Sequence, residues 1–136
     1  MFAIVARDIE RRTPQGSRRP SATRSLLCGA LPSTFFVSLD EHGALTGFLQ
    51  AGLRPHADGC DTSQPVGFVE GWFVHERFRG QGIGKAMMCA TEDWARHHGC
   101  KEVASDTWID HVSSQKAHEA LGFEIVDRCI HFRKAL

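Results

Sequence analysis

Several features that would point to a specific class of protein are missing from this 136-residue chain. It contains no tyrosine, and its 16 basic residues balance 16 acidic ones, so the formal net charge is zero. A nucleic-acid-binding domain usually carries a clear basic excess, which argues against that class. No apolar run approaches the ~18–20 residues that a membrane-spanning helix needs, so we expect no membrane association.

The cysteines and histidines do not form a metal-binding or disulfide pattern. The cysteines are Cys28, Cys60, Cys89, Cys100 and Cys129. No pair shows the spacing of a zinc site or a disulfide framework, so we expect free thiols in a reducing cytoplasm. The adjacent His97 and His98 cannot chelate together, because neighbouring residues of a helix point about 100° apart. We therefore expect no metal.

The length suits one domain, and the composition changes near residue 33. Residues 1–33 contain six arginines and two acids, which gives a local charge of 6 − 2 = +4, and prolines and glycine interrupt them. Apart from a short strand that Phe2–Ala6 would allow, this segment is typical of loop or poorly ordered chain. We expect an irregular Arg-rich segment at 1–33, with an atypical or truncated first strand and helices, followed by a globular domain at 34–136.

Three strands are predicted in the first half of that domain. "STFFVSLD" and "ALTGFLQAGLR" predict a β-hairpin around the turn "EHG". "VGFVEGWFVH" predicts a third strand with Val66, Phe68, Glu70, Trp72 and Val74 on one face and Val69 and Phe73 on the other. Because both faces are largely apolar, we expect this strand to be central and covered on both sides.

The second half alternates helices and strands. Ile83, Met87, Ala90 and Trp94 repeat at helical spacing, and Gly99 stands where a helix C-terminal cap belongs. "CKEVASDTW" predicts a strand, and "SSQKAHEAL" predicts a short helix that Gly122 stops. "FEIVDRCIHFRKAL" predicts one or two final strands.

A glycine-rich stretch, "ERFRGQGIGKA", lies between the third strand and the first helix. Such a junction directs unpaired backbone N–H groups and the positive end of the helix dipole at one point, where anions bind. The spacing fails the dinucleotide fingerprint G-x-G-x-x-G, and Lys85-Ala86 fails the P-loop, which also needs a glycine five residues before Gly84. The motif that remains is R-x-x-G-x-G at Arg79, Gly82 and Gly84.

This motif resembles the pyrophosphate loop of the GNAT acetyltransferase superfamily. The order of elements agrees, and Leu121-Gly122-Phe123 matches the usual end of the family's short helix. "FVEGWFV", "GCKEVASDT" and "SQKAHEALGFE" further resemble the bacterial aminoglycoside 6′-N-acetyltransferases, from about Phe35 to the C-terminus. The resemblance implies an α/β (α+β) fold: a mixed, mostly antiparallel central sheet flanked by helices, with splayed central strands.

The resemblance also implies that acetyl-coenzyme A is the co-substrate. By resemblance, the residues that hold it are Trp72, Phe73, Val74, Arg79, Gly80, Gln81, Gly82, Ile83, Gly84 and Lys85. His111 falls where the family often has an asparagine in contact with the pantetheine arm. Splayed strands leave backbone N–H groups free, and one near Val74 would polarise the thioester carbonyl.

Two carboxylates are candidates for binding the acceptor amine and accepting its proton. Glu70 is a single acid inside an apolar strand, where burial without a partner is costly; its alternative role is an ion pair with a nearby arginine. Asp106 ends the "ASD" strand, and a cap on the following turn is an equally supported role. In the resembled enzymes the matching acids grip the acceptor amines, and such a base typically contributes ~10²–10⁴-fold.

The missing tyrosine matters for the leaving group. Many GNAT enzymes place a tyrosine on the short helix as general acid, and His118 stands at that position here. His118 is a candidate acid but not a required one, because a thiol with a pKa near ~8.5 leaves readily as thiolate. The resemblance further implies a homodimer, in which Asp127 would reach the partner's acceptor site.

Together these features predict acetyl transfer to the 6′-amino group of aminoglycoside antibiotics by direct attack of the amine on the thioester, conferring resistance. Two alternatives stay open. The acceptor would instead be a polyamine, a small amine or a protein N-terminus, or the chain would be a non-catalytic module that binds acetyl-CoA.

Overall fold

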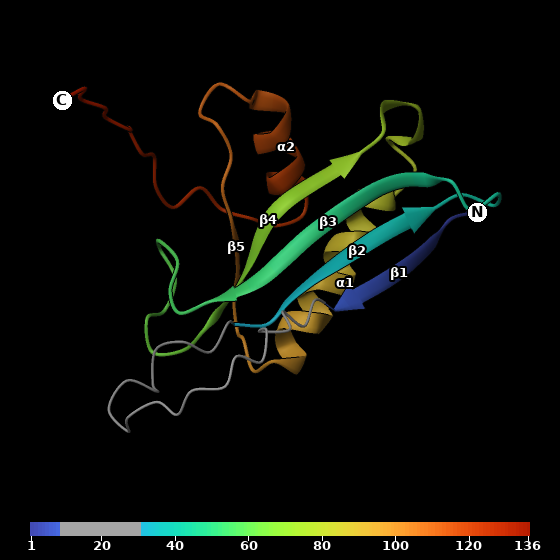
Figure 1. The fold of residues 1–136 in the computed structure, drawn as a ribbon, viewed down its shortest axis with the longest axis horizontal. Helices are drawn as coiled ribbons and strands as arrows, with labels where there is room; N and C mark the ends of the chain where they lie inside the picture. The colour runs from blue at the N-terminus through green and yellow to red at the C-terminus, as the bar shows by residue number, and fades with distance from the viewer. Residues whose placement is uncertain (9–30) are drawn as a thin grey trace.

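The computed structural model describes residues 1–8 and 31–136 (Figure 1). The Arg-rich stretch and Cys28 lie outside these residues. In chain order the elements are β1 (Ala3–Asp8), β2 (Ser33–Leu39), β3 (Leu45–Arg54), β4 (Val66–Val74), a 3₁₀ turn η1 (Glu76–Phe78), α1 (Ile83–His97), β5 (Val103–Ser105) and α2 (Val112–Ala120).

The strands form one sheet in the order β1-β2-β3-β4-β5. The first three pairings are antiparallel, and only β4 and β5 run parallel. The predicted mixed, mostly antiparallel sheet is confirmed. The strand expected at Phe2–Ala6 is present as β1, so the first residues join the same sheet; the division of the chain at residue 33 stays a prediction.

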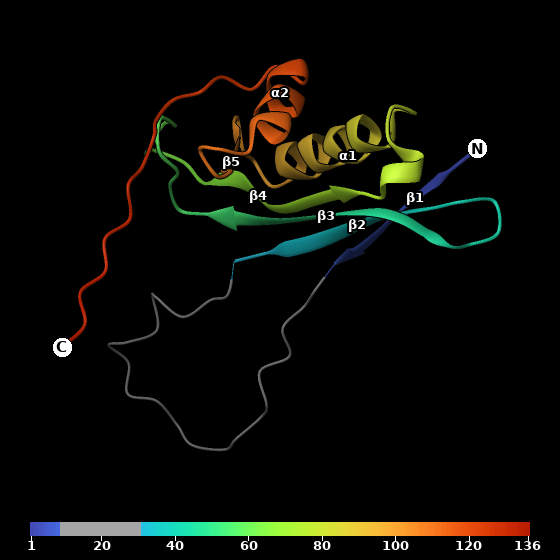
Figure 2. The same cartoon turned by 90° about the horizontal axis from the view of Figure 1, so that it is seen from above.

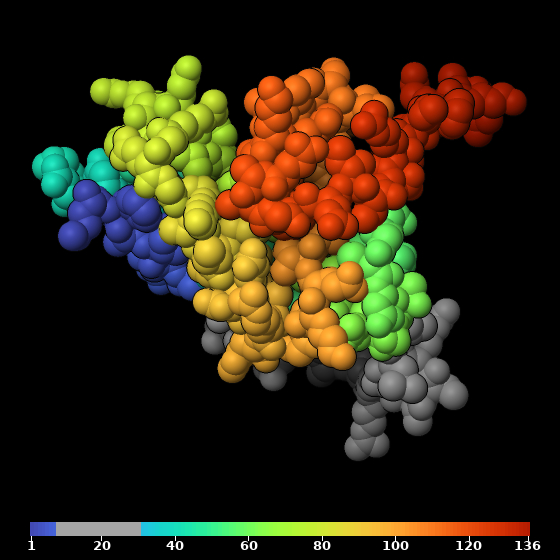
Figure 3. Space-filling view, turned by 180° about the vertical axis from the view of Figure 1, so that it is seen from behind, coloured from blue at the N-terminus to red at the C-terminus, as the bar shows by residue number. Residues whose placement is uncertain are grey.

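Both helices lie on the same side of the sheet (Figure 2). The buried side chains of α1 include Ile83, Met87 and Met88, which pack against Leu49 of β3 and Val69 of β4. Viewed from that side, α1 and α2 lie next to each other on the surface (Figure 3). The core therefore sits between α1 and the middle of the sheet, and the ends of β4 and β5 lie beside α2.

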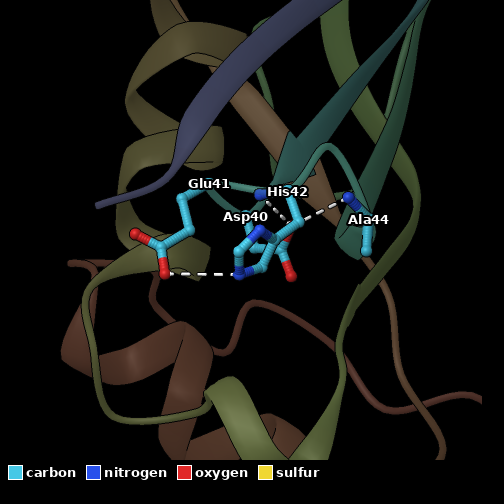
Figure 4. A network of polar contacts seen from close by, with 4 residues as sticks. All are labelled: Asp40, Glu41, His42 and Ala44. Atoms are coloured by element: carbon cyan, nitrogen blue, oxygen red, sulfur yellow. Dashed lines mark hydrogen bonds and ion pairs between the residues drawn. The ribbon is translucent and has the colours of Figure 1, made fainter.

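The turn between β2 and β3 is closed by a carboxylate (Figure 4). Asp40 accepts hydrogen bonds from the backbone N–H groups of His42 and Ala44, at 2.9 and 2.8 Å. The bond from Ala44, helped by that from His42, holds the pKa of Asp40 below its ordinary value of 3.8. This carboxylate fixes the hairpin that the sequence "EHG" predicts.

A β-bulge interrupts β4 at Glu70. The register with β3 places Val69 and Gly71 opposite consecutive residues, so Glu70 is an extra residue on its strand. After the bulge the alternation changes phase, and Trp72 packs on the same core as Val69. The predicted face assignment is therefore wrong beyond Glu70, because an inserted residue shifts every later side chain to the other face.

The bulge also limits how far β4 is covered. Val66 through Val69 are all buried, as expected for a strand covered on both faces, but Glu70 and Phe73 are exposed. The prediction of full coverage holds only for the first half of the strand, and β4 is the fourth of five strands rather than the middle one.

The predicted C-terminal strands are absent. Residues 123–136 form neither strand nor helix. Phe123 packs on His118 and Val126 lies beside Gly59, and the last residues of the chain then extend away from the body of the protein (Figure 1). The exposed apolar side chains of residues 123–136 are Ile125, Val126, Ile130, Phe132 and Leu136. A strand forms only against a partner edge, and the three residues of β5 offer the single chain very little edge to extend.

Candidate active site

The glycine loop ends in an open helix N-terminus. Gly80 and Gly82 have φ values of +75° and +83°, in the left-handed region that favours glycine. Gly82 is the N-cap of α1, and the first helical hydrogen bond is donated by the Ala86 N–H. A Cβ atom at Gly80 or Gly82 would meet no other atom within 4 Å. The N–H groups that precede Ala86 have no partner within the helix, and the glycines beside them are open to solvent, as an anion site requires.

The last glycine of the motif, Gly84, has a different role. A Cβ atom at Gly84 would lie 2.9 Å from Cζ2 of Trp72, so the first turn of α1 rests directly on this indole. The indole Nε1 is buried without a hydrogen-bond partner among the described residues, which makes Trp72 a packing residue at this point. Gly84 thus sets how closely α1 approaches β4.

Strands β4 and β5 separate next to this loop, as predicted. Their pairing runs only from Gly67 to Val69 on the β4 side. The His75 N–H donates to the Thr46 carbonyl at 2.8 Å, and antiparallel pairing alternates, so the Val74 N–H and C=O point away from β3. Arg79 occupies part of that side, since its Nε donates to the Val74 carbonyl at 2.9 Å. The Val74 N–H therefore points toward the gap that opens between β4 and β5 where their pairing ends.

A pocket of about 160 Å³ lies between β4, β5 and α2. Its lining residues are Val69, Glu70, Gly71, Trp72, Ser105, Asp106, Thr107, His111, Ser114 and His118. The fold therefore brings together the three predicted catalytic side chains, which are 48 residues apart at most in the sequence (118 − 70). Asp127 is not among the lining residues; it lies in the exposed C-terminal segment, where its carboxylate accepts the Arg128 N–H at 2.6 Å.

Glu70 makes the ion pair that was the alternative to a catalytic role. Arg54 donates from Nε and Nη2 to its two carboxylate oxygens, at 3.0 and 2.8 Å. The same guanidinium stacks over the Phe68 ring at 3.4 Å from its centroid. The side chains of Arg54 and Glu70 are 41% and 35% exposed, so water screens their attraction. The pair therefore stabilises the fold by about 1 kcal/mol at most. Its main effect is to hold Glu70 in place.

Asp106 is free of such a partner. It is exposed on the strand end that follows Ser105, and among the described residues no hydrogen bond or ion pair to its side chain is found. A cap on the following turn, the alternative role for Asp106, is therefore not formed. Its carboxylate is available to a cation that enters the pocket.

His118 is fixed by contacts on every side. Its Nδ1 lies 2.8 Å from the Ser114 carbonyl oxygen, and its Nε2 lies 2.8 Å from the Ser105 hydroxyl. Trp72 and Phe123 both meet the ring edge-to-face, at centroid distances of 5.3 Å. Sequence reasoning missed two partners of the pocket side chains: Ser105, which lines the pocket beside His118, and Arg54, which pairs with Glu70 from outside the lining. Strand register and helix packing bring them there, so no local pattern points to them.

The rest of the described chain adds no further class of site. Within residues 1–8 and 31–136, no group of three metal-ligating side chains comes together. No described helix has the length and apolar character that a bilayer crossing would need.

Comparison with known proteins identifies the family. A sequence model described as the acetyltransferase (GNAT) family matches residues 4–123. The chain belongs to this family. The predicted resemblance is confirmed.

Among GNAT proteins, the chain is similar to enzymes named aminoglycoside N(6′)-acetyltransferase type 1. It is 39% identical over 101 residues to the one from Stenotrophomonas maltophilia, covering 74% of this chain and 66% of that protein. It is 45% identical over 93 residues to the one from Salmonella typhimurium, covering 68% and 63%. The chain thus spans just under two thirds of the length of these relatives.

The chain also matches solved structures of proteins named AAC(6′). The chain matches AAC(6′)-Iy in complex with the bisubstrate analogue CoA-S-monomethyl-acetylneamine at 41% identity and a TM-score of 0.70, covering 76% of this chain and 70% of that one. It matches AAC(6′)-Ih from Acinetobacter baumannii at 30% identity and a TM-score of 0.70, covering 76% and 71%.

Proposed function

We propose that this protein transfers the acetyl group of acetyl-CoA to the 6′-amino group of aminoglycosides, and so confers resistance to them. The observation that carries the proposal is the pocket that places Glu70 and Asp106 beside the separated ends of β4 and β5. The similarity to enzymes named for this activity, one of them solved with a bisubstrate analogue, supports it.

Acetyl-CoA would bind along the gap between the strands. The pyrophosphate would take the free N–H groups at the start of α1, with Arg79 and Lys85 nearby as cations. The pantetheine arm would run beside Trp72 and Phe73, and His111 lines the pocket close to its end. The thioester would lie at the end of the arm, in the pocket, and a backbone N–H of β4 near Val74 that points into the same gap would stabilise the negative charge that develops on the carbonyl oxygen.

The acceptor would bind through the two carboxylates. An aminoglycoside is a polycation, and each charge-assisted hydrogen bond to Glu70 or Asp106 contributes roughly 1.5–3 kcal/mol. Arg54 uses one position on each oxygen of Glu70, and a carboxylate has about four acceptor positions, so an ammonium group can bind without displacing Arg54.

The reaction is then a direct displacement. The neutral amine attacks the thioester carbonyl carbon, the C–N bond forms, and the C–S bond breaks. The amine gives up one proton to a base of the pocket, and the CoA thiolate leaves and takes up a proton.

Release of free thiol from acetyl-CoA with kanamycin, with spermidine and without an acceptor tests this function. We expect turnover with kanamycin. Turnover with spermidine alone would replace the aminoglycoside by a polyamine acceptor, and binding without any turnover would support a non-catalytic module.

Substitution of the two acids tests the site. Glu70→Gln and Asp106→Asn should each lower kcat/KM for kanamycin about ten- to a hundredfold while acetyl-CoA affinity stays unchanged. Glu41→Gln, an exposed acid outside the pocket, is the control for a loss of one negative charge. If all three variants acetylate kanamycin like the parent, the acids are structural and the proposed acceptor site is wrong.

We also propose that the protein is a homodimer in which the end of the chain, residues 127–136, packs on a second copy. Ile130 and Phe132 are 76% and 92% exposed in the single chain, and this apolar surface favours a partner. Asp127 would then reach the partner's pocket. Light scattering at micromolar concentration should give twice the chain mass, and Phe132→Glu should shift it toward one; a monomeric parent contradicts the proposal.

A cytoplasmic location remains a proposal. The described cysteines, Cys60, Cys89, Cys100 and Cys129, are all free thiols, which suits a reducing compartment.

A further inference from the structure

The hydrogen bonds of His118 fix where its proton lies. The Ser114 carbonyl oxygen lies 2.8 Å from Nδ1 and can only accept a hydrogen bond, and the Ser114 hydroxyl is much farther away, at 3.5 Å, so Nδ1 carries the hydrogen. In the neutral ring Nε2 is then an acceptor, and the group 2.8 Å away from it is the Ser105 hydroxyl. Ser105 therefore donates its proton toward His118, and neutral His118 has no proton to give to the pocket.

This tautomer changes the role that His118 can have. As the neutral ring it cannot act directly as the general acid that replaces the missing tyrosine. It is instead a proton acceptor, and it acts through Ser105, whose hydroxyl is hydrogen-bonded to the ring and which lines the same pocket as the two acids. Once protonated, the ring would have both N–H groups satisfied, Nδ1–H by Ser114 and Nε2–H by the Ser105 oxygen.

The surroundings of the pair support a role in chemistry. Ser105 lines the same pocket as Glu70 and Asp106, at the last residue of β5 before the strands separate. The other titratable groups that line the pocket are Glu70, Asp106 and His111. The aromatic contacts from β4 and from the segment after α2 keep the ring from turning away.

We infer that Ser105 and His118 form a two-way proton relay for acetyl transfer. The inference rests on the proposed function. As the C–N bond forms, the amine proton passes to Ser105 Oγ while the Ser105 proton passes to His118 Nε2. As the C–S bond breaks, the same path runs backward, and the proton goes from His118 through Ser105 to the CoA sulfur. The proton that leaves the nitrogen thus ends on the thiol, and the pair returns to its starting state.

Nuclear magnetic resonance of the unliganded protein tests the starting state without any acceptor. The ¹⁵N shifts of His118 at neutral pH should report a protonated Nδ1 and an unprotonated Nε2. Ser105→Ala should move the Nε2 resonance and leave that of Nδ1 nearly unchanged. A protonated Nε2 in the parent would overturn the inference, whether or not the protein acetylates aminoglycosides.

Steady-state kinetics with kanamycin tests the relay itself. Ser105→Ala should lower kcat by about 100-fold or more, the range typical of general acid–base catalysis, with KM unchanged because Glu70 and Asp106 remain. Ser105→Thr keeps the hydroxyl and should recover most of the activity. His118→Gln should lower kcat as far as Ser105→Ala does, and the double variant should be no slower than either, because the two residues act as one unit.

The outcomes separate the inference from the proposed function. If the parent acetylates kanamycin and Ser105→Ala keeps its kcat, the relay is wrong and the function stands. If the parent acetylates no aminoglycoside, the function is wrong, and the same series is run with the amine that the acceptor screen identifies. Thermal unfolding of each variant excludes misfolding as the cause of a loss.

Discussion

Substituting Gly82 by alanine separates the anion-binding role of the glycine loop from its backbone strain. Gly82 has φ +83° and no atom within 4 Å of an added Cβ, so Gly82→Ala introduces no clash inside the protein. An L-residue in this left-handed conformation costs ~1–2 kcal/mol. The new methyl group would occupy the open space that the first N–H groups of α1 face, where the pyrophosphate is expected.

The loss of affinity follows from the hydrogen bonds that the methyl group blocks. A backbone N–H bound to a charged group contributes roughly 1.5–3 kcal/mol. Because every ~1.4 kcal/mol is tenfold in Kd, losing a single such bond weakens acetyl-CoA binding about 10- to 150-fold.

Gly99→Ala is the matched control. Gly99 has φ +81° and also has no atom within 4 Å of an added Cβ, but it lies after the C-terminal end of the same helix. At 1.5 Å per residue the two ends of this 15-residue helix are ~22 Å apart. Thermal unfolding should show similar destabilisation of both variants, and calorimetry should show weaker acetyl-CoA binding only for Gly82→Ala. Equal affinities in the two variants would refute the assignment of the loop to the pyrophosphate.

Three further outcomes are expected. Gly84→Ala should lower the melting temperature, because its Cβ would lie 2.9 Å from Trp72 and overpacking of this kind costs ~1–3 kcal/mol; an unchanged melting temperature would contradict the contact. Asp40→Asn should be less stable than the parent at pH 7. The folded pKa of Asp40 lies below its ordinary 3.8, so the difference in free energy of unfolding is complete above that pH and should vanish as the pH falls through the lowered pKa. Urea unfolding at several pH values would show this. Cys100 should react more slowly with a thiol reagent than the exposed Cys89, because burial raises the pKa of the Cys100 thiol and covers it; mass-spectrometric mapping that finds equal rates would rule this out.

Local patterns were sufficient to predict most elements of this fold. Alternating apolar residues predicted β2, β3 and β4, and helical spacing predicted α1 together with its cap at Gly99. The R-x-x-G-x-G motif predicted the family, which the comparisons confirm. These signals lie within a few residues of one another, so no knowledge of the tertiary structure is needed to recognise them.

The contacts that define the pocket were not predictable in this way. Arg54 meets Glu70 across 16 residues, and Ser105 meets His118 across 13. Both contacts depend on strand register and on where a helix packs, which the local sequence does not encode. The C-terminal strands failed for a related reason, because strand propensity has no effect until a partner edge is present.

The bulge at Glu70 has a consequence for how the gene can change in length. Deleting one codon between Val69 and Trp72 would restore unbroken alternation along β4. Trp72 would keep its place opposite Leu49 on the core face and Phe73 would stay on the outer face, because the deleted residue is the one that has no partner on β3; only the local bend of the strand would be lost. A deletion in the loop between β3 and β4, at residues 55–65, changes no such phase. A library of single-codon deletions should therefore give folded protein for losses in that loop and at the bulge, and should reject losses between Trp72 and Val74, where each residue already has its own partner on β3.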